Sequence, residues 1–393
     1  MNTQVAIIGG GPAGLLLSEL LHRQGVSSVV LEKHSRAHVL SRIRAGVLEQ
    51  TTVDVLRNSG LSSRMDREGL PHDGVKIVWA ECDGIFVDTA KHVGKRFMTY
   101  GQSSIQEDLF AAADRRNANV LTEVENVELN NVTSDRPHVT FRHGGEAVQL
   151  SCDFIAGCDG FHGVSRKAIP PAVLREFEKS YPFGWLGILS RTRPLPDITY
   201  AYHPRGFALA SHRSHILSRY YIQVPLDNKV EDWSDDRFWA ELKVRYPREL
   251  SEAIVTGPSI EKSITPLRSY VAEPMRHGCL FLAGDAAHVL PPTGAKGLNL
   301  AVSDVFYLAR ALNAFYNHGS TRLLDKYSDM ALRRVWSSVR IAWYLTNLLH
   351  SFPGASDFDR RAQAYELQYL YSSPHAQVAL AEQYAGLSFE ETD

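Results

Sequence analysis

The sequence is poor in cysteine, and its cysteines form no pattern that holds a metal or a disulfide framework. Cys82, Cys152, Cys158 and Cys279 are scattered over 393 residues without any Cys-x-x-Cys spacing. The 16 histidines include no pair at helical metal-ligand spacing in an acidic context. We therefore expect neither a bound metal nor disulfides.

Long apolar runs and a strong net charge are also lacking. No stretch approaches the roughly 18 uninterrupted apolar residues that span a bilayer. The apolar start of the chain has no basic leader and is interrupted by glycines and Pro12. A formal net charge of −2 implies no surface for polyanions. We expect a soluble protein of the reducing cytoplasm that binds neither membrane nor nucleic acid.

A strand–turn–helix–strand unit opens the chain. Residues 4–8 and 26–32 have the β-branched pattern of strands, and residues 12–24 that of a helix ended by Gly25. The turn carries Gly9-x-Gly11-x-x-Gly14, whose glycines let backbone approach a pyrophosphate at the helix N-terminus. Glu32 ends the second strand, where a carboxylate accepts hydrogen bonds from a ribose. This context predicts dinucleotide binding.

Two further segments have the same strand-then-turn character. Asp159-Gly160 follows a buried strand at residues 153–156, and Gly284-Asp285 follows another at residues 279–283. Asp285 is placed to bind a ribityl hydroxyl. The turn at residues 291–297 leads into a predicted helix at residues 299–317, whose start can stabilise negative charge on a flavin pyrimidine.

In this order the three segments resemble the fingerprints of class A flavoprotein monooxygenases. Over nearly the whole chain the sequence resembles the 4-hydroxybenzoate 3-monooxygenase family. The stretches that carry this resemblance are 42–50, 100–102, 181–187, 203–207, 218–225, 230–234 and 291–299.

The resemblance implies an α/β fold and bound FAD. It implies a discontinuous Rossmann-like FAD domain (1–180 and 267–340), an inserted, mainly antiparallel substrate domain (181–266), and C-terminal helices (341–393) that form a homodimer. The cofactor-binding residues it implies are Gly9, Gly11, Gly14, Glu32, Arg42, Arg44, Gln102, Asp159, Arg219, Asp285, Gly297, Leu298 and Asn299.

A predicted hairpin supplies the carboxylate end of the substrate site. Residues 207–214 and 218–224 read as two strands with a loop centred near Ile216, so that Ser211 faces Tyr221 and Arg213 faces Arg219. Two opposed arginines repel unless an anion lies near them, and a guanidinium binds a carboxylate through two parallel donors. The resemblance assigns Ser211, Arg213 and Tyr221 to the substrate carboxylate and leaves Arg219 nearer the flavin.

The phenol end requires removal of a proton, because a phenolate attacks electrophilic oxygen far better than a phenol. The resemblance places Tyr200 at this contact, Tyr384 behind it and His72 at the far end of a proton chain. An unperturbed histidine pKa of about 6.5 suits exchange with solvent. The Pro292 carbonyl is expected to accept the phenol hydrogen bond.

The electron donor is expected to be a transient nicotinamide. The implied contacts are Lys33, His34, Arg42, Arg44, His162, Arg166 and Arg268. Lys33 and His38 depart from the Arg and Tyr of familiar members, yet residues 33–38 stay basic, which favours the 2′-phosphate of NADPH; NADH remains possible.

The other predicted elements are helical. A capping box at residues 104–107 opens a helix to about Arg116, and Ser234 caps a helix at residues 235–246. Residues 328–350 and most of the tail after residue 357 are also predicted to be helical.

The implied reaction is 3-hydroxylation of 4-hydroxybenzoate to 3,4-dihydroxybenzoate with NAD(P)H and molecular oxygen. Two alternatives stay open: the same chemistry on a related hydroxy- or aminobenzoate, and a non-catalytic binding protein on this fold. A substrate panel that follows NADPH loss and oxygen uptake separates the first.

We predict that the purified protein is yellow because it retains FAD. The measurement is its visible absorption spectrum, followed by addition of FAD. A folded, colourless protein that takes up no added FAD would exclude both the enzymatic reading and its closest alternative.

Overall fold

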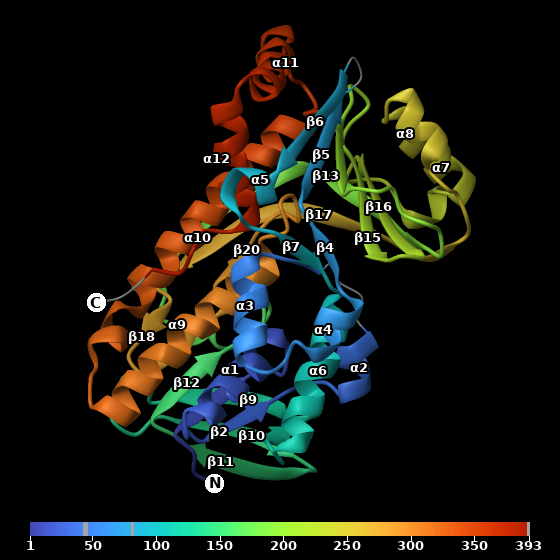
Figure 1. Ribbon diagram of the computed structural model, residues 1–393. Coiled ribbons are helices and arrows are strands. Elements are labelled where there is room, and N and C mark those ends of the chain that lie inside the picture. The colour runs from blue at the N-terminus through green and yellow to red at the C-terminus, as the bar shows by residue number, and fades with distance from the viewer. Residues whose placement is uncertain (42–45, 80–81, 391–393) are drawn as a thin grey trace.

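The computed structural model describes residues 1–41, 46–79 and 82–390. Its lower half in Figure 1 is built on a six-stranded sheet in the order β18-β19-β12-β1-β2-β8. The strands are β1 (Val5–Ile8), β2 (Ser28–Leu31), β8 (Asn119–Leu121), β12 (Phe154–Gly157), β18 (Arg276–His277) and β19 (Leu280–Leu282). All neighbours are parallel except β18 and β19, which suits buried strands joined by crossovers.

The predicted βαβ unit at the start of the chain is confirmed. Helix α1 (Pro12–Arg23) has Pro12 in its first turn, where the missing N–H is no loss. A Cβ at Gly14 would lie 1.9 Å from the Gly9 carbonyl oxygen, so the helix can begin against the turn only if residue 14 is glycine.

Two three-stranded sheets and several short helices flank this core. The strands are β9 (Glu125–Asn130), β10 (His138–His143) and β11 (Glu146–Ser151), and separately β3 (Val47–Leu48), β4 (Leu70–His72) and β7 (Phe97–Thr99). The helices are α2 (Arg36–Ser41), α3 (Gln50–Asn58), α4 (Ser63–Glu68), α5 (Thr89–Val93) and α6 (Gln102–Arg115), with a 3-10 turn at Arg166–Ala168.

The predicted capping box at residues 104–107 is wrong. Helix α6 begins two residues earlier at Gln102, with Gly101 as its N-cap and no side-chain cap. Ser104 therefore lies inside the first turn. Its carbonyl accepts a hydrogen bond from Arg64, and this tertiary contact helps fix the start of the helix in place of the local signal.

An eight-stranded sheet forms the upper half of the molecule in the order β20-β17-β13-β16-β15-β14-β5-β6. Its strands are β5 (Gly74–Trp79), β6 (Cys82–Asp88), β13 (Arg175–Ser190), β14 (Thr199–Tyr202), β15 (Ala208–Ser214), β16 (Leu217–Val224), β17 (Ser259–Glu273) and β20 (His288–Val289). It is antiparallel except where β14 runs parallel to β5. The eight-stranded sheet therefore extends beyond the predicted substrate domain (181–266) in both directions along the chain.

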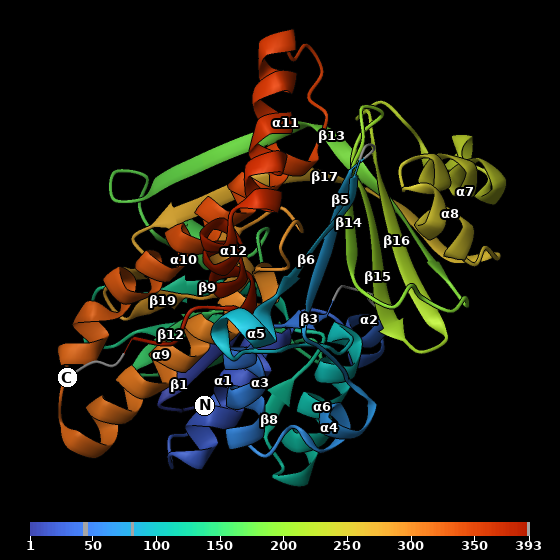
Figure 2. The ribbon, with the colours of Figure 1, turned by 45° about the horizontal axis from the view of Figure 1, so that its top comes forward.

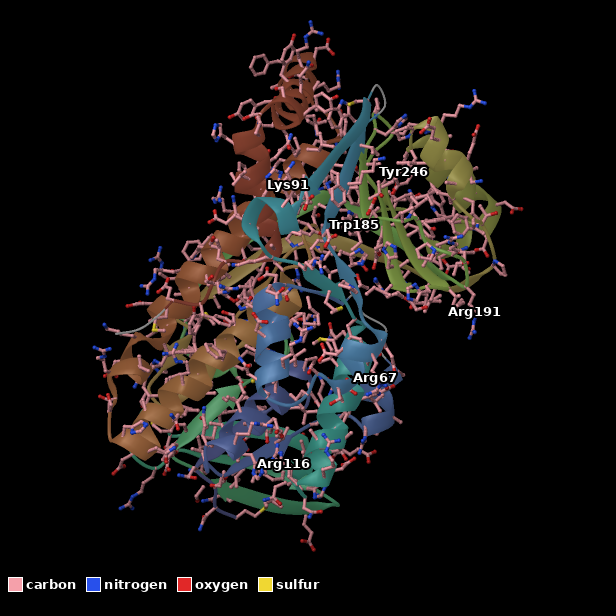
Figure 3. The ribbon with its side chains drawn as sticks, in the orientation of Figure 1. Arg67, Lys91, Arg116, Trp185, Arg191 and Tyr246 are labelled. Atoms are coloured by element: carbon pink, nitrogen blue, oxygen red, sulfur yellow. The ribbon has the colours of Figure 1, made fainter. Side chains whose placement is uncertain are left out.

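Alternating residues of this sheet face two different apolar layers. Trp185 packs on the side of the C-terminal helices, and Leu186 faces helix α7 (Asp235–Val244), which Ser234 caps as predicted. Helix α8 (Arg248–Ala253) and the 3-10 turn at Val230–Asp232 accompany α7. Figure 3 shows Trp185 near the centre of the molecule and Tyr246 on the α7 side.

The predicted hairpin exists, but its register is wrong. Ser211 pairs with Arg219, and Leu209 pairs with Tyr221. The strands turn at His215 and Ile216, and the register shifts next to the turn so that Arg213 forms a bulge. The pairing moves by two residues, an even number, which keeps the side chains of Ser211, Arg219 and Tyr221 on one face.

Long helices complete the chain. They are α9 (Gly297–His318), α10 (Arg322–Leu349), α11 (Asp357–Ser372) and α12 (Pro374–Ala385). The first two begin earlier than predicted. Helices α9 and α10 run side by side along the nucleotide half, whereas α11 projects from the body (Figure 2). Within the described ranges, no helix has the length and apolarity needed to cross a membrane.

Candidate active site

The glycine turn after β1 is held by the carboxylate predicted to bind a ribose. Glu32 Oε2 accepts the Gly10 N–H at 2.7 Å, and Oε1 accepts the His34 N–H at 2.8 Å. A Cβ at Gly11 would meet no atom of the described residues within 4 Å. The start of α1 therefore leaves open space for a phosphate, and Glu32 is fixed beside it.

The second segment presents a buried carboxylate oxygen. Asp159 Oδ2 accepts the Ser165 N–H at 2.9 Å, whereas Oδ1 is buried without a hydrogen-bond partner among the described residues. Burial raises the pKa of Asp159, although the Ser165 hydrogen bonds oppose this rise. A hydroxyl donor from a bound ligand would satisfy Oδ1.

The third segment ends in the turn before α9. Asp285 follows Gly284 in a 3-10 turn, and Gly297, Leu298 and Asn299 form the first turn of α9. Asn299 is anchored from both ends of its amide, because it accepts the Glu49 N–H and donates to the Val47 and Ala295 carbonyls. Gln102 is the first residue of α6. Arg42 and Arg44 lie outside the described residues.

Three predicted carboxylate ligands come together on the hairpin. The Arg213 guanidinium donates to the His212 carbonyl at 2.7 Å and to Ser211 Oγ at 3.4 Å, and Tyr221 is near enough to favour its charged form. Its Nε is buried and unpartnered, and no carboxylate of the described residues forms a salt bridge with it. Burial, with a smaller contribution from Arg219, lowers the pKa of Arg213. Among the described residues no carboxylate pairs with Arg213 directly, although Glu261 acts on its charge from farther away.

Arg219 has its own carboxylate, which sequence reasoning missed. Glu261 lies 3.1 Å from Arg219 Nη1, and Ser263 Oγ accepts from Nη2 at 3.2 Å. Both partners lie on β17, two strands away across β13. Their i, i+2 spacing marks a shared face, but nothing local indicates that this face meets Arg219. The sequence predicted an anion near the two arginines, and the Glu261 carboxylate supplies that negative charge for Arg219.

Gly187 on β13 was also missed as a functional residue. It pairs with Tyr221 and with Ser263. A Cβ there would lie 2.6 Å from the Tyr221 ring and 3.1 Å from Arg219 Nη2. Glycine at this position is what allows the tyrosine ring and the arginine to cross over β13.

The two predicted tyrosines are in contact. Their hydroxyl oxygens lie 3.0 Å apart, and both side chains are buried. Burial raises the pKa of Tyr200 to about 12, and burial also raises that of Tyr384. The Gly294 backbone acts on the Tyr200 pKa and opposes the rise, which places the turn that contains Pro292 near the Tyr200 hydroxyl. The Pro292 carbonyl accepts the Ala295 N–H at 3.0 Å and retains a second lone pair.

His72 is separated from the tyrosines by an aromatic ring. Phe97 stacks on His72 with centroids 5.2 Å apart and meets Tyr384 edge-on at 5.3 Å. His72 Nε2 instead lies 3.1 Å from Thr99 Oγ1. Burial, reinforced by His212, lowers the pKa of His72 to about 4, far from the unperturbed value that we expected.

The predicted nicotinamide contacts form two groups. Lys33 is exposed, and His34 stacks on His38 with centroids 4.1 Å apart. In the second group, the guanidinium carbons of Arg268 and Arg166 lie 3.6 Å and 4.6 Å from the centroid of the Phe161 ring. His162, the next residue, is exposed. Arg166 already donates to the Phe161 and Ala286 carbonyls, so it also joins the second and third nucleotide segments.

Residues 2–342 match a family model described as an FAD binding domain. The chain belongs to this FAD-binding family. A p-hydroxybenzoate hydroxylase from Acinetobacter baylyi is 50% identical over 392 residues, which are 99% of this chain and 96% of the relative. The predicted family resemblance is thereby confirmed.

More distant relatives share less. A probable NADH-specific resorcinol 4-hydroxylase from Rhodococcus jostii is 27% identical over 346 residues, or 82% of this chain and 61% of that protein. The structure of a p-nitrophenol 4-monooxygenase from Pseudomonas putida superimposes with a TM-score of 0.82 at 19% identity, covering 98% of this chain and 99% of the other. The predicted fold class is confirmed.

The residues present fit FAD. The open space beside Gly11, the unpartnered Oδ1 of Asp159 and the free approach at Gly297, where a Cβ would meet nothing within 4 Å, all lie on the three nucleotide segments. Arg166 links the second of these segments to the third. A carboxylate oxygen that can accept from a hydroxyl, together with open helix N-termini that can donate to phosphates, suits a dinucleotide.

The low pKa of His72 predicts a loss of stability in acid. Below about pH 6.5 the unfolded chain protonates this histidine, and the folded chain does not until about pH 4. The free energy of unfolding should therefore fall as pH drops through this window, by about 3 kcal/mol from His72. When unfolding in urea is measured at several pH values, the free energy of unfolding of His72→Gln should fall by about 3 kcal/mol less than that of the parent between pH 6.5 and pH 4. His318→Gln, which changes an exposed histidine, is the control; parallel curves for the parent and His72→Gln would contradict the prediction.

Proposed function

We propose that the protein is an FAD-dependent monooxygenase that hydroxylates 4-hydroxybenzoate at the 3-position. The observation that carries this proposal is the guanidinium of Arg213, which forms no ion pair of its own among the described residues. A partly buried cation that is not ion-paired is unfavourable, and a carboxylate held by two parallel N–H donors is the anion that a guanidinium fits best. The Tyr221 hydroxyl on the same face can donate to a carboxylate oxygen, whereas the Ser211 hydroxyl would first have to leave the Arg219 carbonyl to which it donates.

The hydroxyl pair of Tyr200 and Tyr384 suits the opposite end of a para-substituted ring. With pKa values raised by burial, neither tyrosine is a phenolate at neutral pH. Tyr200 can still accept the substrate proton if it donates its own to Tyr384 in the same movement, since the two oxygens are 3.0 Å apart. The Pro292 carbonyl orients the substrate hydroxyl. Tyr384 must then release its own proton, which His72, across Phe97 and with its pKa lowered to about 4, can relay to solvent but does not retain at neutral pH.

The redox part of the reaction requires a bound cofactor and an electron donor. Bound FAD supplies the redox chemistry, taking a hydride from a reduced nicotinamide and activating molecular oxygen. The chain's glycine turn, Asp159, Asp285 and the start of α9 hold and orient it. We infer that NADPH is the donor, supported by the basic segment around Lys33, although the Rhodococcus relative bears an NADH-specific name. Rates with NADPH and NADH at equal concentration decide between them.

We also infer a cytoplasmic homodimer. Helix α11 carries an exposed aromatic set: Phe358, Tyr365, Tyr369 and Tyr371 are 80%, 63%, 55% and 52% exposed. Such a set on one projecting helix is typical of an interface between copies. Sedimentation of the parent as a monomer would count against the dimer.

Replacing Arg213 by lysine tests the carboxylate site. Arg213→Lys keeps the charge but loses the paired N–H geometry, so 4-hydroxybenzoate binding should weaken by about 2 kcal/mol or more. Perturbation of the flavin absorption on titration with 4-hydroxybenzoate measures it. Arg205→Lys, on the exposed loop before β15, is the control. Unchanged binding in Arg213→Lys would remove this residue from the site.

Replacing Tyr200 by phenylalanine tests proton removal. Tyr200→Phe should leave reduction by the nicotinamide largely intact, because the hydroxyl does not touch the donor, and should uncouple NADPH consumption from product. The ratio of 3,4-dihydroxybenzoate formed to NADPH consumed measures this effect. A ratio equal to that of the parent would refute the role given to Tyr200.

A further inference from the structure

Asp304 is a buried carboxylate to which neither the nucleotide segments nor the substrate site has so far assigned a role. It lies about two turns into α9. Its Oδ2 accepts two hydrogen bonds, from the Gly284 N–H at 2.8 Å and from His288 Nε2–H at 2.7 Å. The side chains of Asp304 and His288 are each only 1% exposed.

This pair joins two segments that hold different ends of the flavin. Gly284 and His288 bracket the turn that contains Asp285, the predicted ligand of the ribityl chain. Asp304 belongs to the helix whose first turn is predicted to face the flavin pyrimidine. One carboxylate oxygen therefore ties the turn to the helix on both sides of Asp285.

The start of α1 also packs close to Gly284. Gly284 has φ +62°, and a Cβ there would lie 3.2 Å from Ala301 Cβ on α9 and 3.6 Å from Ala13 Cβ on α1. The three elements that bind pyrophosphate, ribityl chain and pyrimidine thus converge at Gly284. A shift of the turn by a fraction of an ångström would move Asp285 relative to both helix starts.

The hydrogen bonds of the pair are charge-assisted. Burial lowers the pKa of His288, but the adjacent Asp304 carboxylate raises it more, so the net pKa lies above the usual value. Hydrogen bonds to an ionised acceptor in a dry environment are shorter and stronger than neutral ones. Such a clamp holds the turn more rigidly than a backbone contact would.

We propose that Asp304 and His288 are positioning residues for FAD, which clamp the Gly284–Asp285 turn against α9 so that ribityl and pyrimidine contacts are made together. The proposal requires FAD binding and is independent of which arene is hydroxylated.

The test compares two removals with two conservative replacements. Asp304→Ala and His288→Ala lose the clamp; Asp304→Asn keeps an acceptor, and His288→Gln keeps an N–H donor. Ser303→Ala is the matched control, because Ser303 is the preceding buried residue on α9 and its hydroxyl has no partner among the described residues. Flavin fluorescence on dilution of each holoprotein gives the Kd for FAD, and visible circular dichroism reports the setting of the bound ring.

We expect both alanine variants to raise the FAD Kd about tenfold or more, the scale of one lost charged hydrogen bond. Asp304→Asn and His288→Gln keep the hydrogen bonds without the charge and should recover part of the lost affinity, and Ser303→Ala should match the parent. Parent-like FAD affinity and flavin dichroism in His288→Ala would overturn the proposal, even if its thermal midpoint fell. If Asp304→Ala does not fold, His288→Ala against His288→Gln decides, and equal Kd values for these two would also overturn it.

Discussion

The positive charge of Arg213 is the constraint on which the architecture of the site depends. Its guanidinium is held by neutral oxygens, whereas the neighbouring Arg219 has Glu261 and Ser263. Pairing both arginines internally would make the fold more stable, since an unpaired buried charge is unfavourable. The structure instead keeps one cation available. The long strands β13 and β17 serve this arrangement, because they carry Gly187 and Glu261 across to the hairpin.

Those parts of the fold that depend on local geometry could be predicted from the sequence. The spacing of Gly9, Gly11 and Gly14 dictates a tight turn into a helix, and Ser234 dictates a helix start at Asp235. The strands of the hairpin followed from alternation. Their register did not, because His215 and Ile216 give no glycine or asparagine signal for a two-residue turn, and the bulge at Arg213 has no sequence mark. The face was still correct because the error was an even number of residues.

Contacts between residues distant in sequence were beyond prediction from a single chain. Glu49 forms ion pairs with Lys296 and Arg334, and all three side chains are buried. The parallel pairing of β14 with β5 brings β5 and β6 into the larger sheet, and this pairing too has no local signal in the sequence. The His72 environment belongs here too: its low pKa arises from burial and from His212, which approaches it from the start of the hairpin's bulge. In each case the chemistry of a residue is set by a neighbour that sequence spacing does not reveal.

Under the proposed function, the division of charge between the two arginines would favour arenes that carry a carboxylate. A carboxylate neutralises Arg213, and Arg219 gains little because Glu261 already lies beside it. A phenol without a carboxylate would fill the same volume and leave the Arg213 cation uncompensated, now with even less water near it, which raises the cost of burying the charge. Preference for an arene with a carboxylate over one without would therefore need no side chain that sterically excludes the latter. It would follow from one guanidinium that neutral oxygens hold and no described carboxylate pairs with, together with a pair of tyrosine hydroxyls whose pKa values burial has raised.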